Sequence, residues 1–513
     1  MKKDNAKNFK YMFIIWILIL CIGFVRRTLQ NDTFYTIKIG KLILDNGIDM
    51  LDHFSFHTNL AYTYPHWLYD VLMYLIYHLF NYPGLYISSM IFLSMVLLIV
   101  FKTNVKNTNN YIISAFGTLL CALAISGFAT ARAQLVSFIL FALEIYFIES
   151  FLRNGRKRNL IGLLIISIFI CNIHVAVWPF YYIVYLPYLA EYLITIICKK
   201  IKLKKENKFT NFFKKRIVLE ENKNIKFLFI TMLLSLLTGL ITPIGDTPYT
   251  YFIKLAMGNA QEYVQEHQRM TWISSPFTII IVVETLFFAI ISKIKLRDLF
   301  MILGLSLMSV LSIRHGSLLA LIGTICFARV FNMFLEKFNY HPEEKLYIFF
   351  NKKIVIIISF LIAIAFSITS VTIRYHKEDY IDKKMYPVDA VKYIKENIDV
   401  KNMRIFNEYN FGSYLLLNDI PVFIDSRADL YTKQFSGFDY DIFDDFEFMP
   451  EFYQEKFDFY NITHVLIYKT DNTFYKMLQR DENYTVLYED DNFILFKRAD
   501  DIKQYANIRI TKN

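Results

Sequence analysis

Long apolar blocks separated by charged stretches run along the first 372 residues of the chain. Most blocks have roughly 15–22 residues, close to the ~20 that an α-helix needs to cross the hydrocarbon core of a bilayer. The pattern predicts a polytopic α-helical membrane protein with about eleven transmembrane helices. We expect these helices at residues 11–25, 84–101, 111–128, 134–152, 159–175, 177–198, 227–243, 276–292, 299–313, 318–335 and 354–372.

One further apolar segment, residues 66–80, is short for a span. His66, Asp70 and His78 recur on one face of it at helical spacing. Counting it as a span would also place every later basic loop on the opposite side of the membrane. We therefore expect an amphipathic helix in the outer interface. It would belong to a long, structured first outer loop at residues 26–83.

The tail, residues 373–513, has a different pattern, in which short apolar runs alternate with helical periodicity. This alternation predicts a small α/β domain with a partly parallel sheet. Strands are expected at 403–406, 421–425 and 464–469, and a hairpin at 484–498 turns at Glu489–Asn492. Helices are expected at 387–398, 412–417, 449–460 and 472–480.

Composition and charge separate the same two parts. The chain is 55% hydrophobic with a net charge of +10, whereas soluble domains are about 45–50% apolar. Residues 1–372 hold 37 Lys and Arg against 20 Asp and Glu, while residues 373–513 hold 19 against 26. A basic membrane part with a mildly acidic tail argues against a nucleic-acid partner. No Walker A, GxGxxG or GxSxG motif points to a soluble-nucleotide enzyme or a serine hydrolase.

The distribution of basic residues predicts the topology. With the N-terminus in the cytoplasm, the inner loops hold 28 Lys and Arg against 8 in the outer segments before the tail. This positive-inside bias predicts a plasma-membrane protein whose tail is extracytoplasmic. The basic loop 199–226 fits a topology-setting loop at an anionic leaflet better than a lipid or nucleic-acid site.

Ionisable and polar side chains gather at the outer ends of the predicted spans, where they are costly unless they have partners. We interpret this as a pocket at the outer face that combines a general base with several cations. Its candidate residues are Asp32, Asp49, Asp52, His66, Arg132, Gln134, Asn172, His174, Arg314 and His315.

Such a set suits the transfer of a group from a phosphate-linked donor held in the bilayer. The Asp32 carboxylate could take the proton of an attacking hydroxyl. Arg132, Arg314 and His174 could stabilise the departing phosphate. Asp52 and His66 would support the pocket.

Each residue also has a structural interpretation. Asp32 could be a helix N-cap, and Arg132 could extend to the lipid headgroups. Asn172 and His174 could form hydrogen bonds between packed helices. A metal site has little support, because Asp49, Asp52, His53 and His57 could supply ligands for a divalent cation but lack zinc-type spacing.

Several short motifs resemble a known family. They are the run from Asp32 to Gly47, Asp52–Phe56 and His66–Leu68, followed by Arg132–Leu135, Asn172–His174 and Arg314, and in the tail Phe406–Tyr409, Gly412–Leu415 and Phe423–Arg427. In this order they resemble bacterial polytopic membrane proteins grouped with the GT-C glycosyltransferases, in the dolichyl-phosphate-mannose transferase-like superfamily. The chain departs from the usual pattern at His53, Ala133 and Val175, where the relatives tend to have Pro, Pro and Gly.

The resemblance implies an inside N-terminus, juxtamembrane helices in the first outer loop and a soluble domain after the last span. It also implies a polyprenyl-phosphate-linked sugar as donor and, by position, Asp32 as the acidic residue after the first span.

The tail motif Asp425–Tyr431 follows a predicted strand. Asp425 and Arg427 could bind the hydroxyls of an acceptor, or they could form an internal ion pair.

The residues and the resemblance together predict a GT-C-type membrane glycosyltransferase. Its partners would be the lipid-linked donor, membrane lipids and an acceptor glycan, lipid or protein. The alternatives are a transporter or flippase, which would have charges along a membrane path, and a non-catalytic scaffold of an envelope polysaccharide system.

Overall fold

The structure is a computed structural model that describes residues 2–200, 215–258, 269–271, 273–377, 379–470 and 473–499. Part of the predicted basic loop, residues 201–214, lies outside the described residues. The chain divides into two compact units. The helical unit comprises Met1–Arg27, Pro65–Ile253 and Gln261–Asp379, and the α/β unit comprises Thr28–Tyr64, Lys254–Ala260 and Tyr380–Asn513. Residues 28–64 of the predicted first outer loop are thus grouped with the tail.

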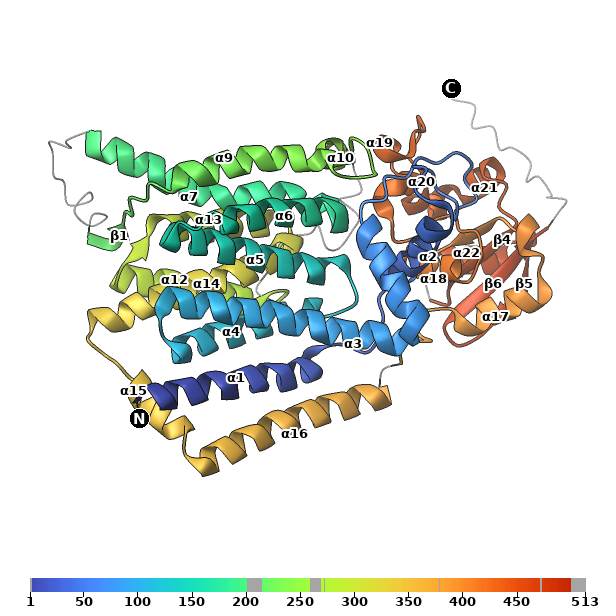
Figure 1. Cartoon of the computed structure of the whole chain (residues 1–513). Coiled ribbons are helices and arrows are strands. Elements are labelled where there is room, and N and C mark those ends of the chain that lie inside the picture. Colours follow the sequence, from blue (N-terminus) through green and yellow to red (C-terminus); the bar gives the residue numbers. More distant parts are fainter. Residues whose placement is uncertain are drawn as a thin grey trace, which may run out of the picture. The chain divides into compact units, whose positions relative to one another are not determined.

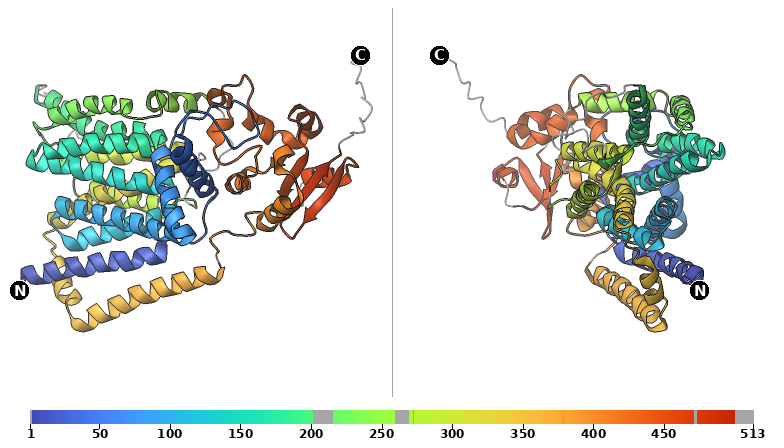
Figure 2. Two further views of the ribbon diagram at one scale, coloured as in Figure 1. Left: turned by 45° about the vertical axis from the view of Figure 1, so that its right-hand side comes forward. Right: turned by 90° about the vertical axis from the view of Figure 1, so that its left-hand side faces the viewer.

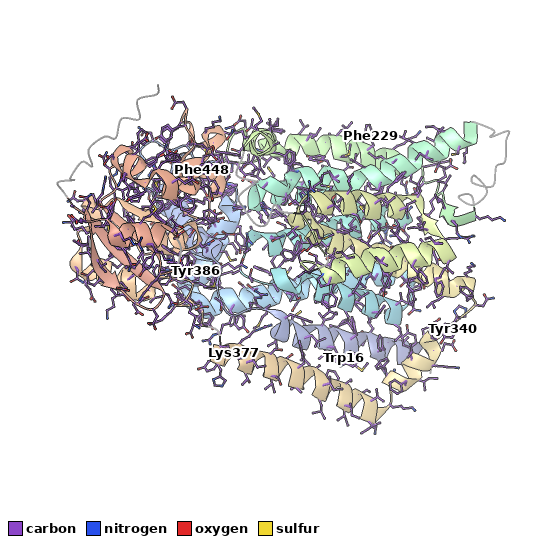
Figure 3. The ribbon with its side chains drawn as sticks, turned by 180° about the vertical axis from the view of Figure 1, so that it is seen from behind. Trp16, Phe229, Tyr340, Lys377, Tyr386 and Phe448 are labelled. Carbon is purple, nitrogen blue, oxygen red and sulfur yellow. The ribbon has the colours of Figure 1, made fainter. Side chains whose placement is uncertain are left out.

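The helices of the helical unit lie side by side in one bundle (Figures 1 and 2). Apolar side chains such as Phe229, which is 44% exposed, cover its outer surface (Figure 3). The bundle contains α1 (Lys2–Phe24), α3 (Trp67–Thr108), α4 (Tyr111–Ile125), α5 (Ala133–Asn154), α6 (Arg158–Ile173), α7 (Trp178–Lys200), α9 (Ile225–Ser235), α12 (Pro276–Ile291), α13 (Leu296–Leu311), α14 (Ile313–Lys337) and α16 (Lys353–Lys377). Shorter elements are α10 (Thr247–Met257), α15 (Glu343–Phe350) and the two-residue parallel strands β1 (Ile217–Val218) and β2 (Ile294–Lys295).

Every predicted span coincides with helical structure, including 227–243, which falls on α9 and the 3-10 turn Leu236–Leu240. Seven described helices are long and apolar enough to cross a membrane. Arg158–Ile173, Ile225–Leu240 and Pro276–Ile291 are shorter apolar helices. The membrane location is therefore supported by length and composition, and the count of eleven spans stays a prediction.

The long helix α3 joins two segments that the sequence predicted separately. Its first part contains the predicted amphipathic helix 66–80, and its second part contains the predicted span 84–101. Between them the backbone leaves the helical region at Asn81, with φ 54° and ψ −157°. Pro83 follows and lacks the N–H that a continuous helix would use. The interfacial location of the first part stays a prediction.

The central helix α14 is buried over most of its length, with α4, α12 and α13 packed against it. Small residues allow this approach: a Cβ at Gly117 of α4 would lie 3.2 Å from the Cβ of Ala328. Close packing of small residues is the usual means of helix association where lipid replaces water. In contrast, α16 packs mainly on α1, where Ser367 Oγ donates a hydrogen bond to the Ile19 carbonyl oxygen at 2.6 Å.

A buried network of charges joins α5, α7, α13 and α14 at the predicted cytoplasmic side. Each arginine in it contacts more than one carboxylate, which offsets the cost of burying the charges. Arg329 binds Glu149 at 2.8 Å and Asp298 at 3.1 Å, and Arg297 binds Glu191 and Glu220, both at 2.8 Å. The sequence analysis did not single out this network, because its members come from distant helices.

The α/β unit contains a four-stranded sheet of order β3-β4-β6-β5. Its strands are β3 (Ile405–Asn407), β4 (His464–Tyr468), β5 (Tyr484–Glu489) and β6 (Phe493–Arg498). The β3–β4 pair is parallel and the other pairs are antiparallel. The helices are α2 (Asn31–Asn46), α17 (Val388–Asn397), α18 (Tyr409–Leu417), α19 (Lys433–Ser436), α20 (Ile442–Glu447), α21 (Met449–Phe459) and α22 (Thr473–Arg480).

The prediction of a strand at 421–425 is wrong. Val422 forms only an isolated bridge, with Ser55. The Asn407 side chain takes the place of a neighbouring strand: its Oδ1 accepts from Phe423 N at 2.9 Å and its Nδ2 donates to the Ile424 carbonyl at 2.8 Å. One amide side chain thus satisfies both backbone groups that a strand ladder would use.

Candidate functional site

Two arginines stand at the starts of long helices in the helical unit. Arg132 is the N-cap of α5, and Arg314 is the second residue of α14. Helix N-termini present unpaired backbone N–H groups and a partial positive charge, so both positions favour anions. The arginine side chains add full charges to the same ends, which makes this region suited to a phosphate.

His174 links these helix starts. Its imidazole is 3% exposed, and Nε2 lies 3.2 Å from Arg314 Nη2. Since a guanidinium only donates, Nε2 must accept, and Nδ1 then donates to Ser137 Oγ at 2.9 Å. Ser137 in turn donates to the Ala133 carbonyl oxygen at 3.0 Å. This chain of hydrogen bonds fixes a neutral His174 against Arg314.

His66, the N-cap of α3, completes the cluster. Its ring centroid lies 4.7 Å from that of His174. Burial, followed by the charges of Arg314 and Arg132, lowers the pKa of His66 to about 3. Both imidazoles are therefore neutral at pH 7, and the positive charge belongs to the arginines. We call His66, Arg132, His174 and Arg314 the cation cluster.

Of the two other predicted residues at these helix starts, Gln134 packs at the cation cluster and His315 does not. Gln134 Nε2 donates to Ser317 Oγ at 3.1 Å, and Ser317 Oγ donates to the Arg314 carbonyl oxygen at 2.9 Å, which joins the starts of α5 and α14. His315 points elsewhere: its Nδ1 lies 3.0 Å from the Met308 carbonyl oxygen, and its ring packs on Phe180 at 4.9 Å.

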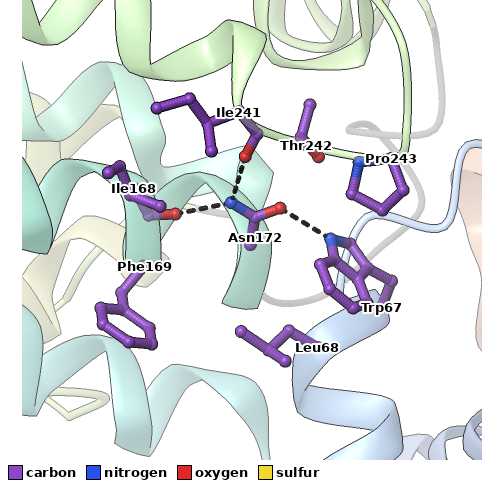
Figure 4. A pocket seen from close by; sticks show the side chains of 8 residues that line it. All are labelled: Trp67, Leu68, Ile168, Phe169, Asn172, Ile241, Thr242 and Pro243. Atoms are coloured by element: carbon purple, nitrogen blue, oxygen red, sulfur yellow. Dashed lines mark hydrogen bonds between the residues drawn. The ribbon is translucent and has the colours of Figure 1, made fainter.

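An apolar pocket of about 400 Å³ is lined by residues of α3, of α6 and of the segment 241–243 (Figure 4). Two of its lining residues are close in sequence to members of the cation cluster. Trp67 directly follows His66, and Asn172 precedes His174 by two residues. Asn172 is fully hydrogen bonded: its Oδ1 accepts from Trp67 Nε1 at 2.9 Å, and its Nδ2 donates to the carbonyls of Ile168 at 2.8 Å and Ile241 at 3.0 Å. The asparagine thus builds the pocket, as its packing interpretation predicted. The lining residues are Trp67, Leu68, Ile168, Phe169, Asn172, Ile241, Thr242 and Pro243.

Asp32 lies in the α/β unit, as the second residue of α2. The N-cap of this helix is Gln30, so the interpretation of Asp32 as an N-cap is wrong. Asp32 lies inside the first turn, where the helix dipole stabilises a carboxylate. The preceding residue, Asn31, donates from Nδ2 to the Tyr409 carbonyl oxygen at 2.8 Å and so attaches this turn to α18.

Asp52, Asp425 and Arg427 form a buried ion cluster in the α/β unit. Arg427 Nη1 lies 2.7 Å from Asp52 Oδ1, and its Nη2 and Nε lie 2.6 and 2.8 Å from the two oxygens of Asp425. Burial raises the pKa of Asp52, but the charge of Arg427 and the hydrogen bonds of Ser55 outweigh it and leave that pKa lowered. The arrangement favours the interpretation of Asp425 and Arg427 as an internal ion pair. The binding of an acceptor by these two residues stays a prediction.

Comparisons with known proteins give a similar fold but no related sequence. No protein-family model matches the sequence, and no curated protein matches it. Solved structures do match. The fold resembles that of an archaeal oligosaccharyltransferase. That neighbour is AglB from Archaeoglobus fulgidus, whose solved structure is in complex with an inhibitory peptide and a dolichol-phosphate. The TM-score is 0.54 at 10% identity, and the match covers 90% of this chain and 69% of AglB. At that identity the likeness to AglB shows a shared fold.

The candidate ligands for a divalent cation have other partners. Asp49 Oδ2 lies 2.7 Å from His53 Nε2, Asp52 binds Arg427, and His57 Nε2 lies 2.8 Å from the Phe423 carbonyl oxygen. Within the described ranges, no group of three or more His, Cys, Asp or Glu side chains could hold a metal ion. The sequence analysis missed Ser137, although its place three residues after Gln134 on α5 puts both on one helix face.

Proposed function

We propose that this chain is a membrane glycosyltransferase of GT-C type, which transfers a sugar from a polyprenyl-phosphate carrier to an acceptor outside the plasma membrane. The observation that carries the proposal is the cation cluster, in which two arginines at helix starts adjoin two neutral histidines in ring contact, and one of these, His174, accepts a hydrogen bond from Arg314. Such a group binds phosphate through the guanidinium donors and helix N-termini together.

The apolar pocket supports a lipid-linked donor in particular. Its lining includes Trp67, which directly follows His66, and Asn172, which lies two residues before His174. A polyprenyl phosphate has the matching division, an anionic head on an apolar chain. The fold shared with AglB, whose structure contains a dolichol-phosphate, is consistent with the same class of carrier.

In the proposed reaction Asp32 is the general base. An acceptor hydroxyl oxygen forms a bond to the anomeric carbon of the donor sugar, and its proton passes to the Asp32 carboxylate. The bond between that carbon and the phosphate oxygen breaks, and its electron pair leaves with the polyprenyl phosphate. Arg132 and Arg314 would stabilise the charge on this leaving group. The acceptor would be an envelope glycan, a lipid or a protein.

The test is the consumption of a panel of polyprenyl-phosphate sugars by the purified protein in lipid, with membrane extract as the source of acceptor. Wild type is compared with Asp32→Asn, which removes the base and keeps the shape of the side chain. We expect one donor to be consumed by wild type and a loss of kcat in the variant. Asp45→Asn, at an exposed position near the other end of α2, is the matched control and should keep full activity.

The alternative functions give different results. A transporter or flippase would bind a donor and move it between leaflets without breaking the sugar–phosphate bond. A scaffold would neither bind nor consume any donor, and its Asp32→Asn variant would behave as wild type in cells. A fully active Asp32→Asn enzyme would exclude Asp32 as the base while leaving the transferase class intact.

A further inference from the structure

Helices α2 and α18 of the α/β unit pack side by side and run in the same direction. At their first turns, Asn31 Nδ2 donates to the Tyr409 carbonyl oxygen at 2.8 Å. One turn further along α2, the rings of Phe34 and Tyr414 lie 5.3 Å apart. Beyond them, Lys38 pairs with Asp419, which lies just past the end of α18. The order of these contacts places the two helix N-termini together.

Each of these neighbouring N-termini has a carboxylate. Asp32 is the second residue of α2, and Glu408 is the N-cap of α18. Two tyrosines connect them through pairwise electrostatic interactions. The buried Tyr386 interacts with Asp32 and with the half-buried Tyr468, and Tyr468 interacts with Glu408. Glu408 therefore belongs to the same end of the helix pair as the proposed base.

Glu408 does not have the role that its position would normally give it. An N-cap side chain usually accepts a hydrogen bond from the backbone of the first turn, but Glu408 makes no such bond. In the part of the chain that the structure describes, its carboxylate has no hydrogen-bond or ion-pair partner. It is only partly buried, so a ligand can reach it.

The surroundings of Glu408 tune its charge. The titratable groups that face it are Glu447 from α20 and Tyr468 from β4, and Asp32 lies at the adjoining end of α2. Burial, followed by the negative charge of Glu447, raises the pKa of Glu408 to about 7. A carboxyl group that is unpaired, reachable and titrates near neutrality is typical of a functional group and unusual for a structural one.

We propose that Glu408 is the carboxylate that binds and positions the hydroxyl-bearing acceptor beside Asp32. This inference rests on the proposed transferase function. The ionised carboxylate accepts a hydrogen bond from a second hydroxyl of the acceptor, while the attacking hydroxyl gives its proton to Asp32. Glu408 exchanges no proton in the transfer itself. It is a positioning residue, and its loss acts on the use of acceptor.

The expected pH dependence follows from the sign of the shift. Below pH 7 Glu408 is mostly protonated, so the hydrogen bond that it accepts from the acceptor hydroxyl is no longer charge-assisted and acceptor binding weakens. The amount of acceptor that half-saturates the enzyme should therefore fall as the pH rises through about 7. Removing the negative charge of Glu447 should move this midpoint to lower pH, because it removes one of the two causes that raise the pKa of Glu408.

The experiment measures transfer at several pH values with a dilution series of membrane-extracted lipid and glycan as acceptor, at saturating donor. Glu408→Gln should raise the half-saturating amount of acceptor about tenfold at pH 8, the effect of one charge-assisted hydrogen bond. It should also abolish the pH limb, by which we mean the fall of this half-saturating amount as the pH rises through about 7. Glu447→Gln should keep the maximal rate and move the limb to lower pH. Glu396→Gln, an exposed residue of α17, is the control and should change neither.

A normal pH limb and normal acceptor use in Glu408→Gln, with an active wild type, would overturn the role of Glu408 and leave the transferase proposal standing. An unmoved limb in Glu447→Gln would overturn it too, even if Glu408→Gln did not fold. A wild type that neither binds nor consumes any donor would instead overturn the proposed function, and with it this inference.

Discussion

His174 Nε2 accepts a hydrogen bond from Arg314 Nη2 across 3.2 Å, and this contact joins the end of α6 to the start of α14. The imidazole is buried and held from its other side by Ser137. Such a neutral acceptor fixes the direction of a guanidinium without cancelling its charge. A carboxylate in the same place would neutralise the arginine and weaken its attraction for phosphate. The pair is therefore arranged to present a full positive charge in one orientation.

We expect His174→Phe to lower kcat for sugar transfer by about 10²-fold, because Arg314 loses its orientation while its charge remains. The phenyl ring fills most of the same space, so folding should survive. His174→Gln places an amide oxygen near the position of Nε2 and should recover part of the rate. Initial-rate kinetics at saturating donor would measure both variants. Equal losses in the two would show that the histidine acts through packing alone.

The apolar pocket makes a prediction about the lipid part of the donor. Ile168→Trp would fill space between Phe169 and Ile241 and exclude part of an isoprenoid chain. Each methylene group that is no longer buried costs ~0.8 kcal/mol, so the KM for a long-chain donor should rise about tenfold. A donor with a shortened chain should be affected less, since it has fewer groups to place there.

Ile165→Trp is the matched control for the pocket. Ile165 lies on the same helix, α6, and is 47% exposed outside the pocket. Its replacement should leave the KM for both donors unchanged. If Ile168→Trp impaired the long-chain and short-chain donors equally, the lipid chain would lie elsewhere and the pocket would have only a packing role.

The positions of the helices could be predicted from the sequence because each apolar block contains its own signal. The hairpin was equally local, since Glu489–Asn492 supplies both its turn and its register. The strand expected at 421–425 was wrong because its partner is the side chain of Asn407, and no local pattern indicates that. The apolar run alone gives no information on whether a neighbouring strand exists.

The sequence predicted the charged residues of the candidate site but not the contacts between them. His66, Arg132, His174 and Arg314 were found because charges and imidazoles at the ends of apolar helices are conspicuous. Their connection through Ser137 was not, since serines are frequent in membrane helices and only the fold shows which imidazole faces one. Glu408 stands in the tail motif Phe406–Tyr409, but no pattern in the sequence indicated a role for it. Its significance depends on the pairing of α2 with α18, which are far apart in the sequence.

The ion cluster around Arg427 predicts a strong effect on stability. Arg427→Met would leave Asp52 and Asp425 buried without their cation, which typically costs ~3–5 kcal/mol. We expect faster hydrogen exchange in β4 and β6, the buried strands of the same unit, at pH 7. The control is Lys395→Met, which removes an exposed lysine of α17. It should change the free energy of unfolding, as obtained from hydrogen exchange, by less than about 0.5 kcal/mol.

The pH dependence of that loss has a definite sign. In wild type, Arg427 and Ser55 hold the pKa of Asp52 below its unfolded value despite burial, so Asp52 stabilises the fold at neutral pH. This contribution is lost as the pH falls through the folded pKa. Without Arg427, only the hydrogen bonds of Ser55 oppose burial, so the pKa of Asp52 rises, and the variant should gain stability relative to wild type as the pH falls from about 7 to 4. A difference in hydrogen exchange that stayed constant over this range would contradict the role assigned to the Asp52–Arg427 ion pair.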